Sequence, residues 1–170
     1  LLSRKGFHVR LKDISGDAVT TAYREAAKAF KTLVSRRRMK KGEAANALAA
    51  ISATTAPAGR AGLEASECVI EAVVEDMEIK KTVLREVEPG LAEDAVFATN
   101  TSSLSIDEIA SVATRPERVA GLHFFNPVHR MPLVEIVIGE KTSSETIAKL
   151  ETLSRAIGKY PLRVKNGPGF

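Results

Sequence analysis

A short apolar run followed by a charged helical stretch constrains the fold of this chain more than any other feature. Residues 68–74 read CVIEAVV, which is β-branched and apolar apart from one acid. Such a run is typical of a strand in a parallel sheet whose two faces are both covered. A charged helix is predicted to follow over residues 77–87 and to end near Pro89 and Gly90. The two segments together predict one strand–helix unit of an α/β sheet.

The same alternation extends along the whole chain. Alanines and larger apolar residues at three- and four-residue spacings predict a long helix with Ser15 as its N-cap, running to about Lys41 and stopped by Gly42. We predict further helices over residues 43–50, 105–112 and 144–157, and further strands over residues 7–11, 51–54, 95–99, 119–124, 132–138 and 160–164. Strands that alternate with helices predict a doubly wound, mostly parallel, Rossmann-like α/β sheet.

The two ends of the chain lack parts of a complete nucleotide-binding fold. Such a sheet normally opens with a strand and a Gly-x-Gly-x-x-Gly turn, and the 170 residues contain no such turn. Residues 1–6 resemble the end of a first helix, and residues 166–170, NGPGF, resemble a hinge. We therefore expect residues 1–170 to be one domain that lacks its first strand and Gly-rich loop, a fragment between two missing pieces.

Composition narrows the class of protein. Hydrophobic residues at 44% and charged residues at 27% are ordinary for a globular domain. No apolar run is long enough to span a bilayer, and the first residues do not resemble a secretory signal. The single cysteine, Cys68, is expected to be an inert core residue and cannot form an internal disulfide. This fits a reducing compartment, for which we expect the cytoplasm, with the peroxisome or the mitochondrion as alternatives.

The net charge of +4 owes much to one basic run, RRRMKK at residues 36–41. The run is either a solvated helix face or a contact for an anionic partner. Nucleic acid is disfavoured, because two tyrosines and no tryptophan leave little for base stacking, and no nucleic-acid-binding motif accompanies the run. A phosphate-bearing small molecule fits the charge equally well.

Polar side chains follow several predicted strands, at the edge where ligands bind in open α/β sheets. Asp13 follows the first strand, where an acid bonds the adenosine ribose and favours NAD over NADP, although aspartate there also forms turns or caps helices. Ile14 and Ser15 are placed to supply those turn and cap roles instead. Glu75 ends the buried strand and Lys80 follows about one turn later; taken alone, they are best interpreted as a surface pair near a helix start, where an acid suits the helix dipole. Residues 100–103, NTSS, are expected to cap the next helix, contact a ligand, or do both.

His123 and Glu135 are the strongest candidates for chemistry. His123 ends a predicted strand before Pro127, and Glu135 lies 12 residues later within the apolar run LVEIV. This spacing allows a strand to turn back and bring the carboxylate beside the imidazole, where it orients the ring and stabilises its charged form. A base of this kind takes a hydroxyl proton while hydride leaves the same carbon. The histidine spacings do not match a metal site.

Three motifs resemble one known family. Residues 123–135, HFFNPVHRMPLVE, are similar to the signature of 3-hydroxyacyl-CoA dehydrogenases, and VHRMP within them is most similar to the multifunctional β-oxidation enzymes. Residues 70–75, IEAVVE, and 98–104, ATNTSSL, match the same family in the same order. The resemblance covers essentially the whole chain.

The resemblance implies an NAD-dependent oxidation of (S)-3-hydroxyacyl-CoA to 3-ketoacyl-CoA in fatty-acid β-oxidation. It implies His123 as the general base, Glu135 as its orienting acid and Ser102 as a contact to the substrate's 3-oxygen near the nicotinamide. It also implies Asp13 as the ribose contact. The other residues implied to line the cofactor site are Val73, Val74, Glu75, Lys80 and Asn126. The implied partner is an acyl-CoA, with the CoA phosphates as a candidate partner for the basic run. The implied assembly is a homodimer or a multifunctional β-oxidation polypeptide.

Three alternatives remain open from the sequence. One is a related dehydrogenase that acts on another 3-hydroxy substrate, such as a short 3-hydroxybutyryl-CoA or a sugar acid. Another is a non-catalytic dinucleotide- or CoA-binding module, which would not need the acid–base pair of His123 and Glu135. A nucleic-acid binder is a distant third.

Because the Gly-rich loop and a C-terminal helical domain are absent from these residues, we expect this stretch alone to bind NAD poorly and to turn over little.

Overall fold

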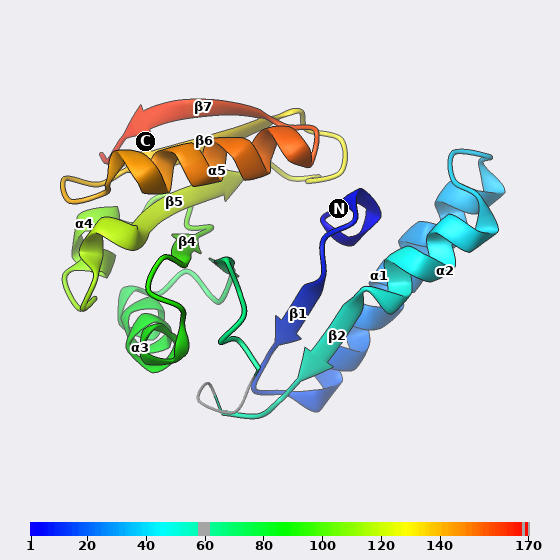
Figure 1. The fold of residues 1–170 in the computed structure, drawn as a ribbon, viewed down its shortest axis with the longest axis horizontal. Helices are drawn as coiled ribbons and strands as arrows, with labels where there is room; N and C mark the ends of the chain where they lie inside the picture. The colour runs from blue at the N-terminus through cyan, green and yellow to red at the C-terminus, as the bar shows by residue number, and fades with distance from the viewer. Residues whose placement is uncertain (58–61, 168, 170) are drawn as a thin grey trace. The chain divides into compact units, whose positions relative to one another are not determined.

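The computed structural model describes residues 1–57, 62–167 and 169, and the chain divides into two compact units. The first unit, Leu1–Gly62, holds β1 (Val9–Lys12), α1 (Gly16–Ser35), α2 (Lys41–Ala49) and β2 (Ile51–Thr54), after a short 3-10 turn. β1 and β2 pair in parallel. α1 and α2 pack against each other as a hairpin that connects the two strands (Figure 1).

The first helix of the hairpin is shorter than the helix predicted to reach Lys41, whereas α2 lies close to the second helix predicted over residues 43–50. α1 ends at Ser35, because Arg37 adopts a left-handed conformation with φ of 56°. The amide of Arg38 then donates back to the carbonyl of Leu33 at 2.8 Å, which closes the helix end. Gly42, predicted to be the stop, lies instead inside α2. The prediction was wrong here because a left-handed helix end normally signals itself by glycine, and this one uses arginine.

The second unit, Leu63–Phe170, is built on a five-stranded sheet in the order β3-β4-β5-β6-β7. Its elements in chain order are β3 (Cys68–Glu71), α3 (Met77–Val87), β4 (Val96–Thr99), α4 (Ile106–Ala110), β5 (Val119–Phe124), β6 (Leu133–Ile138), α5 (Ser144–Ala156) and β7 (Tyr160–Lys165). All pairings are parallel except the one between β5 and β6. The predicted mostly parallel α/β fold is confirmed, with element ends shifted by a few residues.

Helices pack on both faces of this sheet. Leu150 of α5 joins a buried cluster on one face with Leu122 and Ile136, and α5 lies along β5, β6 and β7 (Figure 1). On the other face, Ile106 of α4 comes close to Gly121 of β5. Successive residues of β5 therefore face opposite layers, as the alternation of side chains along a strand requires.

Two predicted elements of this unit are shorter than expected. β3 ends at Glu71 rather than Val74, because the amide of Val73 bonds to the Glu71 side chain instead of to a neighbouring strand. α4 begins after Ser105, whose hydroxyl accepts from the amide of Glu108.

Within residues 1–57, 62–167 and 169, no helix is both long enough and apolar enough to cross a membrane.

Candidate active site

The carboxyl ends of three neighbouring strands meet at one edge of the second unit's sheet. β3, β4 and β5 run parallel in that order, so the segments after Glu71, Thr99 and Phe124 leave the sheet at the same edge. β6 returns antiparallel to β5 from this edge. Ligands of open α/β sheets bind at such an edge, and most of the residues predicted to be functional lie on these segments.

His123 and Glu135 form the pair that their spacing predicts. They are direct partners in the antiparallel ladder between β5 and β6, and His123 Nδ1 lies 2.9 Å from Glu135 Oε2. Both side chains are 18% exposed, which leaves the pair largely shielded but still reachable from solvent. The Phe125 ring tilts against the imidazole, with ring centroids 4.9 Å apart. The ring is therefore oriented by a carboxylate on one side and an aromatic contact beside it.

Asn100 secures the end of the strand that carries His123. Its side-chain oxygen accepts the backbone amide hydrogen of Phe124 at 2.9 Å, and the backbone amide of Asn100 donates to the backbone carbonyl of Glu71 at 2.8 Å. The residue thus connects the ends of β3, β4 and β5. It was expected to cap the following helix, but Ser105 performs that role. The position of Asn100 helps to fix where the imidazole lies.

Glu75 organises the polar segment after β4. Its Oε1 accepts from the hydroxyl of Thr101, from the amide of Ser102 at 2.8 Å and from the hydroxyl of Ser102 at 3.3 Å. Partial burial opposes ionisation of Glu75, but these hydrogen bonds, together with Lys80, outweigh it and lower the pKa of the carboxyl below its ordinary value. Glu75 is therefore an anion that holds Ser102 from β3's side of the edge.

Lys80 is buried, and it does not form the surface pair with Glu75 that the sequence suggested. Its side chain is 1% exposed, and its Nζ donates to Glu71 at 2.9 Å and lies 3.4 Å from Glu75. Glu71 is equally buried and also accepts from the Thr99 hydroxyl at 2.7 Å. Sequence reasoning did not single out Glu71 or Thr99. The signal was available for Glu71, because an acid within an apolar strand needs a buried partner, the argument that favoured Glu135.

The exposed side chains at this edge fit the ring end of a dinucleotide. Val73 is 39% exposed and Val74 is 62% exposed, so apolar surface is left open beside the Glu75 carboxylate. Asn126 is also exposed, at the end of the segment after His123. Apolar surface suits a flat ring, and the amide, hydroxyl and carboxylate groups suit its polar substituents. Val73, Val74, Ser102 and Asn126 are the residues available to hold such a ring.

Asp13 belongs to the first unit, directly after β1. Its Oδ1 accepts the amide hydrogen of Ser15 at 2.9 Å, and the Ser15 hydroxyl accepts from the amide of Ala18 to cap α1. The turn role expected of Ile14 and Ser15 is thus performed by Asp13 itself, while Ser15 supplies the cap. The aspartate remains exposed. Its carboxylate is accessible at the carboxyl end of a parallel strand, as a ribose contact requires.

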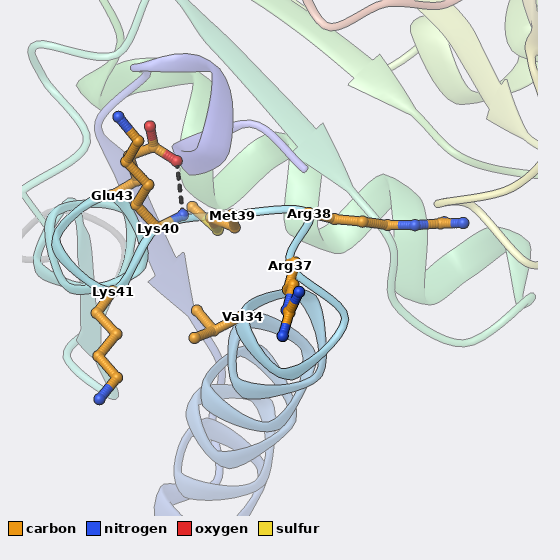
Figure 2. Close-up of a pocket in the computed structure, with 7 residues that line it drawn as sticks. All are labelled: Val34, Arg37, Arg38, Met39, Lys40, Lys41 and Glu43. Carbon is orange, nitrogen blue, oxygen red and sulfur yellow. Dashed lines mark hydrogen bonds between the residues drawn. The ribbon is translucent and has the colours of Figure 1, made fainter.

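The basic run lies at the turn between α1 and α2, beside an open cavity of about 550 Å³. The lining residues are Val34, Arg37, Arg38, Met39, Lys40, Lys41 and Glu43. In Figure 2 the side chains of Arg37, Arg38 and Lys41 extend in different directions, and the amide of Lys40 bonds to Glu43 at 2.9 Å. Diverging cations fit a solvated surface better than one built phosphate site.

Two other candidate chemistries receive no support. Among the described residues, no three His, Cys, Asp or Glu side chains are grouped so that they hold a metal ion. Cys68 is half-buried, and burial raises the pKa of its thiol to about 12. A thiol that stays protonated is a poor nucleophile, so Cys68 fits the inert role predicted for it.

The chain is similar to known dehydrogenases along nearly its whole length. Residues 1–167 match the model of the family described as 3-hydroxyacyl-CoA dehydrogenase, NAD binding domain. A 3-hydroxybutyryl-CoA dehydrogenase from Escherichia coli K12 is 36% identical with a TM-score of 0.94, and the match covers 99% of this chain and 35% of that one. An (S)-3-hydroxybutyryl-CoA dehydrogenase from Ralstonia eutropha is 39% identical with a TM-score of 0.94, covering 99% of this chain and 58% of that one.

The similarity extends to a multifunctional protein. The dehydrogenase part of multifunctional enzyme 1 from C. elegans is 30% identical with a TM-score of 0.83, and the match covers 98% of this chain and 37% of that one. The chain thus spans between about a third and three fifths of the length of these relatives. The family match and the shared fold agree with the motifs around His123 and Ser102, and the chain belongs to the 3-hydroxyacyl-CoA dehydrogenase family, of which it is the NAD-binding domain.

Proposed function

We propose that the protein containing this chain oxidises an (S)-3-hydroxyacyl-CoA to the 3-ketoacyl-CoA with NAD, as a step of fatty-acid β-oxidation. The observation that carries the proposal is the His123–Glu135 pair, with Nδ1 2.9 Å from Oε2 at the ligand edge of the sheet. A module that only binds CoA or a dinucleotide does not need an oriented acid–base pair. An alcohol oxidation does, because a proton must leave the hydroxyl as hydride leaves its carbon.

His123 is the base in this proposal. With Nδ1 turned to Glu135, Nε2 takes the hydroxyl proton, and the carboxylate of Glu135 stabilises the imidazolium that forms. Bound NAD supplies the hydride acceptor. The C–H and O–H bonds of the alcohol break, a C=O double bond forms, and the proton stays on His123 until it passes to water. Ser102 contacts the 3-oxygen and keeps it near the imidazole.

Each unit carries residues that this proposal assigns to NAD. Asp13 holds the adenosine ribose, and Val73, Val74 and Asn126 line the nicotinamide end. Glu75 lines the site as an anion that also accepts from the amide of Ser102. Lys80 lies beneath the surface, where its ammonium is close to the Glu75 carboxylate. The side chains of Val73 and Val74 are open enough to touch a ring, at 39% and 62% exposure.

We propose a short acyl-CoA as the preferred substrate, because the E. coli and R. eutropha relatives carry the name 3-hydroxybutyryl-CoA dehydrogenase. A panel of acyl lengths tests this preference. The CoA phosphates are the proposed partner of the basic side chains around residues 36–41, through screened surface attraction. The proposed assembly is a homodimer or a multifunctional polypeptide, and the proposed location is the cytoplasm.

The test is NADH formation from NAD and (S)-3-hydroxybutyryl-CoA, followed by absorbance with the full-length protein. We expect His123→Ala to lower kcat by about 10²- to 10⁴-fold, the usual contribution of a general base. His129→Ala is the matched control, an exposed histidine six residues further on, and is expected to leave kcat unchanged. An inactive parent that still binds NAD or CoA would favour a binding module, and activity that survives His123→Ala would remove the assigned base.

We also propose that residues 1–170 alone turn over little. The chain contains no Gly-x-Gly-x-x-Gly turn, and such a turn supplies the backbone amides that hold a pyrophosphate. Comparing residues 1–170 with the full-length protein in the same assay tests this. Equal turnover by the two would contradict it.

A further inference from the structure

Glu71 is a buried acid with a complete set of partners just below the ligand edge. Its Oε1 accepts from the amide of Val73 at 2.6 Å and from Lys80 Nζ at 2.9 Å. Its Oε2 accepts from the Thr99 hydroxyl at 2.7 Å and also lies 3.2 Å from Lys80 Nζ. The side chains of Glu71 and Lys80 are each 1% exposed. Burying two charges is unfavourable unless geometry and extra hydrogen bonds compensate, and here both carboxylate oxygens are engaged twice.

The backbone of Val73 is held from both sides by this ion pair. Its amide donates to Glu71, and its carbonyl accepts from Lys80 Nζ at 3.4 Å. Val73 lies outside the strand ladder, since β3 ends at Glu71. The side chains of Glu71 and Lys80 thus take over from the sheet in fixing this segment. The path of the exposed residues Val73 and Val74 depends on the pair.

The network continues from Lys80 to the serine proposed to face the substrate. Lys80 Nζ lies 3.4 Å from Glu75 Oε2, and Glu75 accepts from the amide of Ser102 at 2.8 Å. One ammonium therefore serves two carboxylates, one buried and one partly exposed. Lys80 is among the causes that lower the pKa of Glu75, behind the hydrogen bonds from Thr101 and Ser102. A change at Glu71 is transmitted to Ser102 through two contacts.

We propose that Glu71 is a positioning residue of the cofactor site, acting through Lys80 on the Val73–Val74 backbone and on Glu75. It touches neither cofactor nor substrate. Its carboxylate holds the Lys80 ammonium below the surface of the site. There the ammonium contacts Glu75 and the carbonyl of Val73. This inference rests on the proposed function for the placement of Val73 and Val74 beside the cofactor and of Ser102 beside the substrate, and its main consequence is for NAD binding.

Replacing Glu71 by glutamine keeps the shape and removes the charge. The amide group can accept from Thr99 or from Val73, but its NH₂ group faces the Lys80 ammonium as a second donor. Lys80 is then drawn toward Glu75, and the Val73 segment loses a charge-assisted hydrogen bond. Such bonds contribute enough that losing one weakens binding by about tenfold or more. We therefore expect Kd and KM for NAD to rise by about tenfold in Glu71→Gln.

The experiment uses the full-length protein and measures NAD binding by isothermal titration calorimetry beside steady-state kinetics. A loss of folded protein lowers the maximal rate without changing KM, whereas a positioning role raises Kd and KM for NAD and leaves KM for the acyl-CoA nearly unchanged. Glu86→Gln is the matched control, an exposed acid on α3. It is expected to leave all these constants unchanged.

The double variant Glu71→Gln/Lys80→Met keeps the test decisive if the single variant fails to fold. It removes both buried charges and leaves Val73 without its ionic partners, so NAD affinity is again expected to fall by about tenfold. Unchanged NAD affinity in a folded Glu71→Gln variant, or in the double variant where only that one folds, would overturn the inference. A parent that binds NAD but does not oxidise 3-hydroxyacyl-CoA would overturn the proposed function alone, because the effect of Glu71 on NAD affinity would still be measurable.

Discussion

Glu135 lies directly across the antiparallel β5–β6 ladder from His123, with its Oε2 2.9 Å from the imidazole Nδ1. Both residues are anchored in strands, so the pair is fixed by sheet register and not by a loop. A slip of one residue in this register would turn the two side chains to opposite faces of the sheet. The only antiparallel pairing in the described sheet is thus the one that brings His123 and Glu135 together.

Glu135→Gln is expected to lower kcat by about tenfold to a hundredfold, the loss seen when the partner that orients a metal-bound histidine is replaced. Glutamine can still bond to Nδ1 but cannot stabilise the charged ring that forms as the proton is taken. Steady-state kinetics of the full-length protein measure the loss. Glu140→Gln, an exposed position in the turn after β6, is the matched control. Equal kcat in Glu135→Gln and the parent would remove the orienting role of Glu135.

Gly121→Ala is expected to destabilise the second unit by about 1–3 kcal/mol, the usual range for overpacking. An added Cβ would lie 2.7 Å from Val137 Cβ and 3.0 Å from Ile106 Cδ1, so β5 must move away from β6 or α4. His123 lies two residues further along β5 and is expected to move with it. Urea unfolding measures the loss of stability, and kcat reports the displaced histidine.

Gly42→Ala is the control for this substitution. A Cβ at Gly42 meets nothing within 4 Å, and the residue lies inside α2, where alanine is favoured over glycine by about 0.5–1 kcal/mol. Stability is therefore expected to stay the same or rise. If Gly121→Ala behaved like Gly42→Ala, the close packing of β5 against β6 would not hold in solution.

Sequence patterns predicted the parts of the site that depend on strand periodicity. The 12-residue spacing of His123 and Glu135, with Glu135 inside an apolar run, was enough to predict their contact. Asn100 and Ser102 were placed at the correct edge because both follow a clear strand. In each case the position of the residue followed from one strand and from the point where that strand ends.

The rest depends on contacts that periodicity does not encode. An acid within an apolar strand indicates that Glu71 needs a partner, but the sequence does not tell which cation pairs with it, and Lys80 lies nine residues away on a helix. Lys80 itself was expected near the surface, yet its long side chain turns inward to two carboxylates. The end of α1 was not predicted, because the left-handed residue that follows it is Arg37 and not the usual glycine.

Glu75→Gln is expected to reduce stability at neutral pH and to matter less in acid. The pKa of Glu75 is lowered below its ordinary 4.5 in the folded protein, because hydrogen bonds from Thr101 and Ser102 and the charge of Lys80 outweigh its burial. The stabilisation from its ionised form is therefore fully present above about pH 4.5 and is lost as pH falls through the lower folded value.

Urea unfolding of the parent and of Glu75→Gln between about pH 7 and about pH 3 measures this dependence. The difference in unfolding free energy is expected to shrink toward the acid end. Glu93→Gln, at an exposed position, provides the reference for a generic loss of one carboxylate. A difference that stayed constant across the range would mean that ionised Glu75 does not hold the Thr101–Ser102 segment.

Lys159→Met is expected to loosen the turn that joins β5 to β6. Lys159 is 6% exposed, its Nζ donates to the carbonyls of Val128 and Met131, and burial lowers its pKa. Methionine matches the length of lysine but donates no hydrogen bond. The amides of Arg130 and Met131, which both bond to the carbonyl of Pro127, are expected to exchange with deuterium about tenfold faster, as the loss of about 1.4 kcal/mol of local stability implies.

Hydrogen–deuterium exchange followed by mass spectrometry resolves this turn from the strands around it. Exchange in β5 and β6 is expected to change little, because their ladder does not involve Lys159. Lys165→Met, an exposed lysine at the end of β7, is the matched control and is expected to leave the turn unchanged. If exchange at residues 128–131 were the same in Lys159→Met as in the parent, the buried ammonium would not be what orders the turn that follows Asn126.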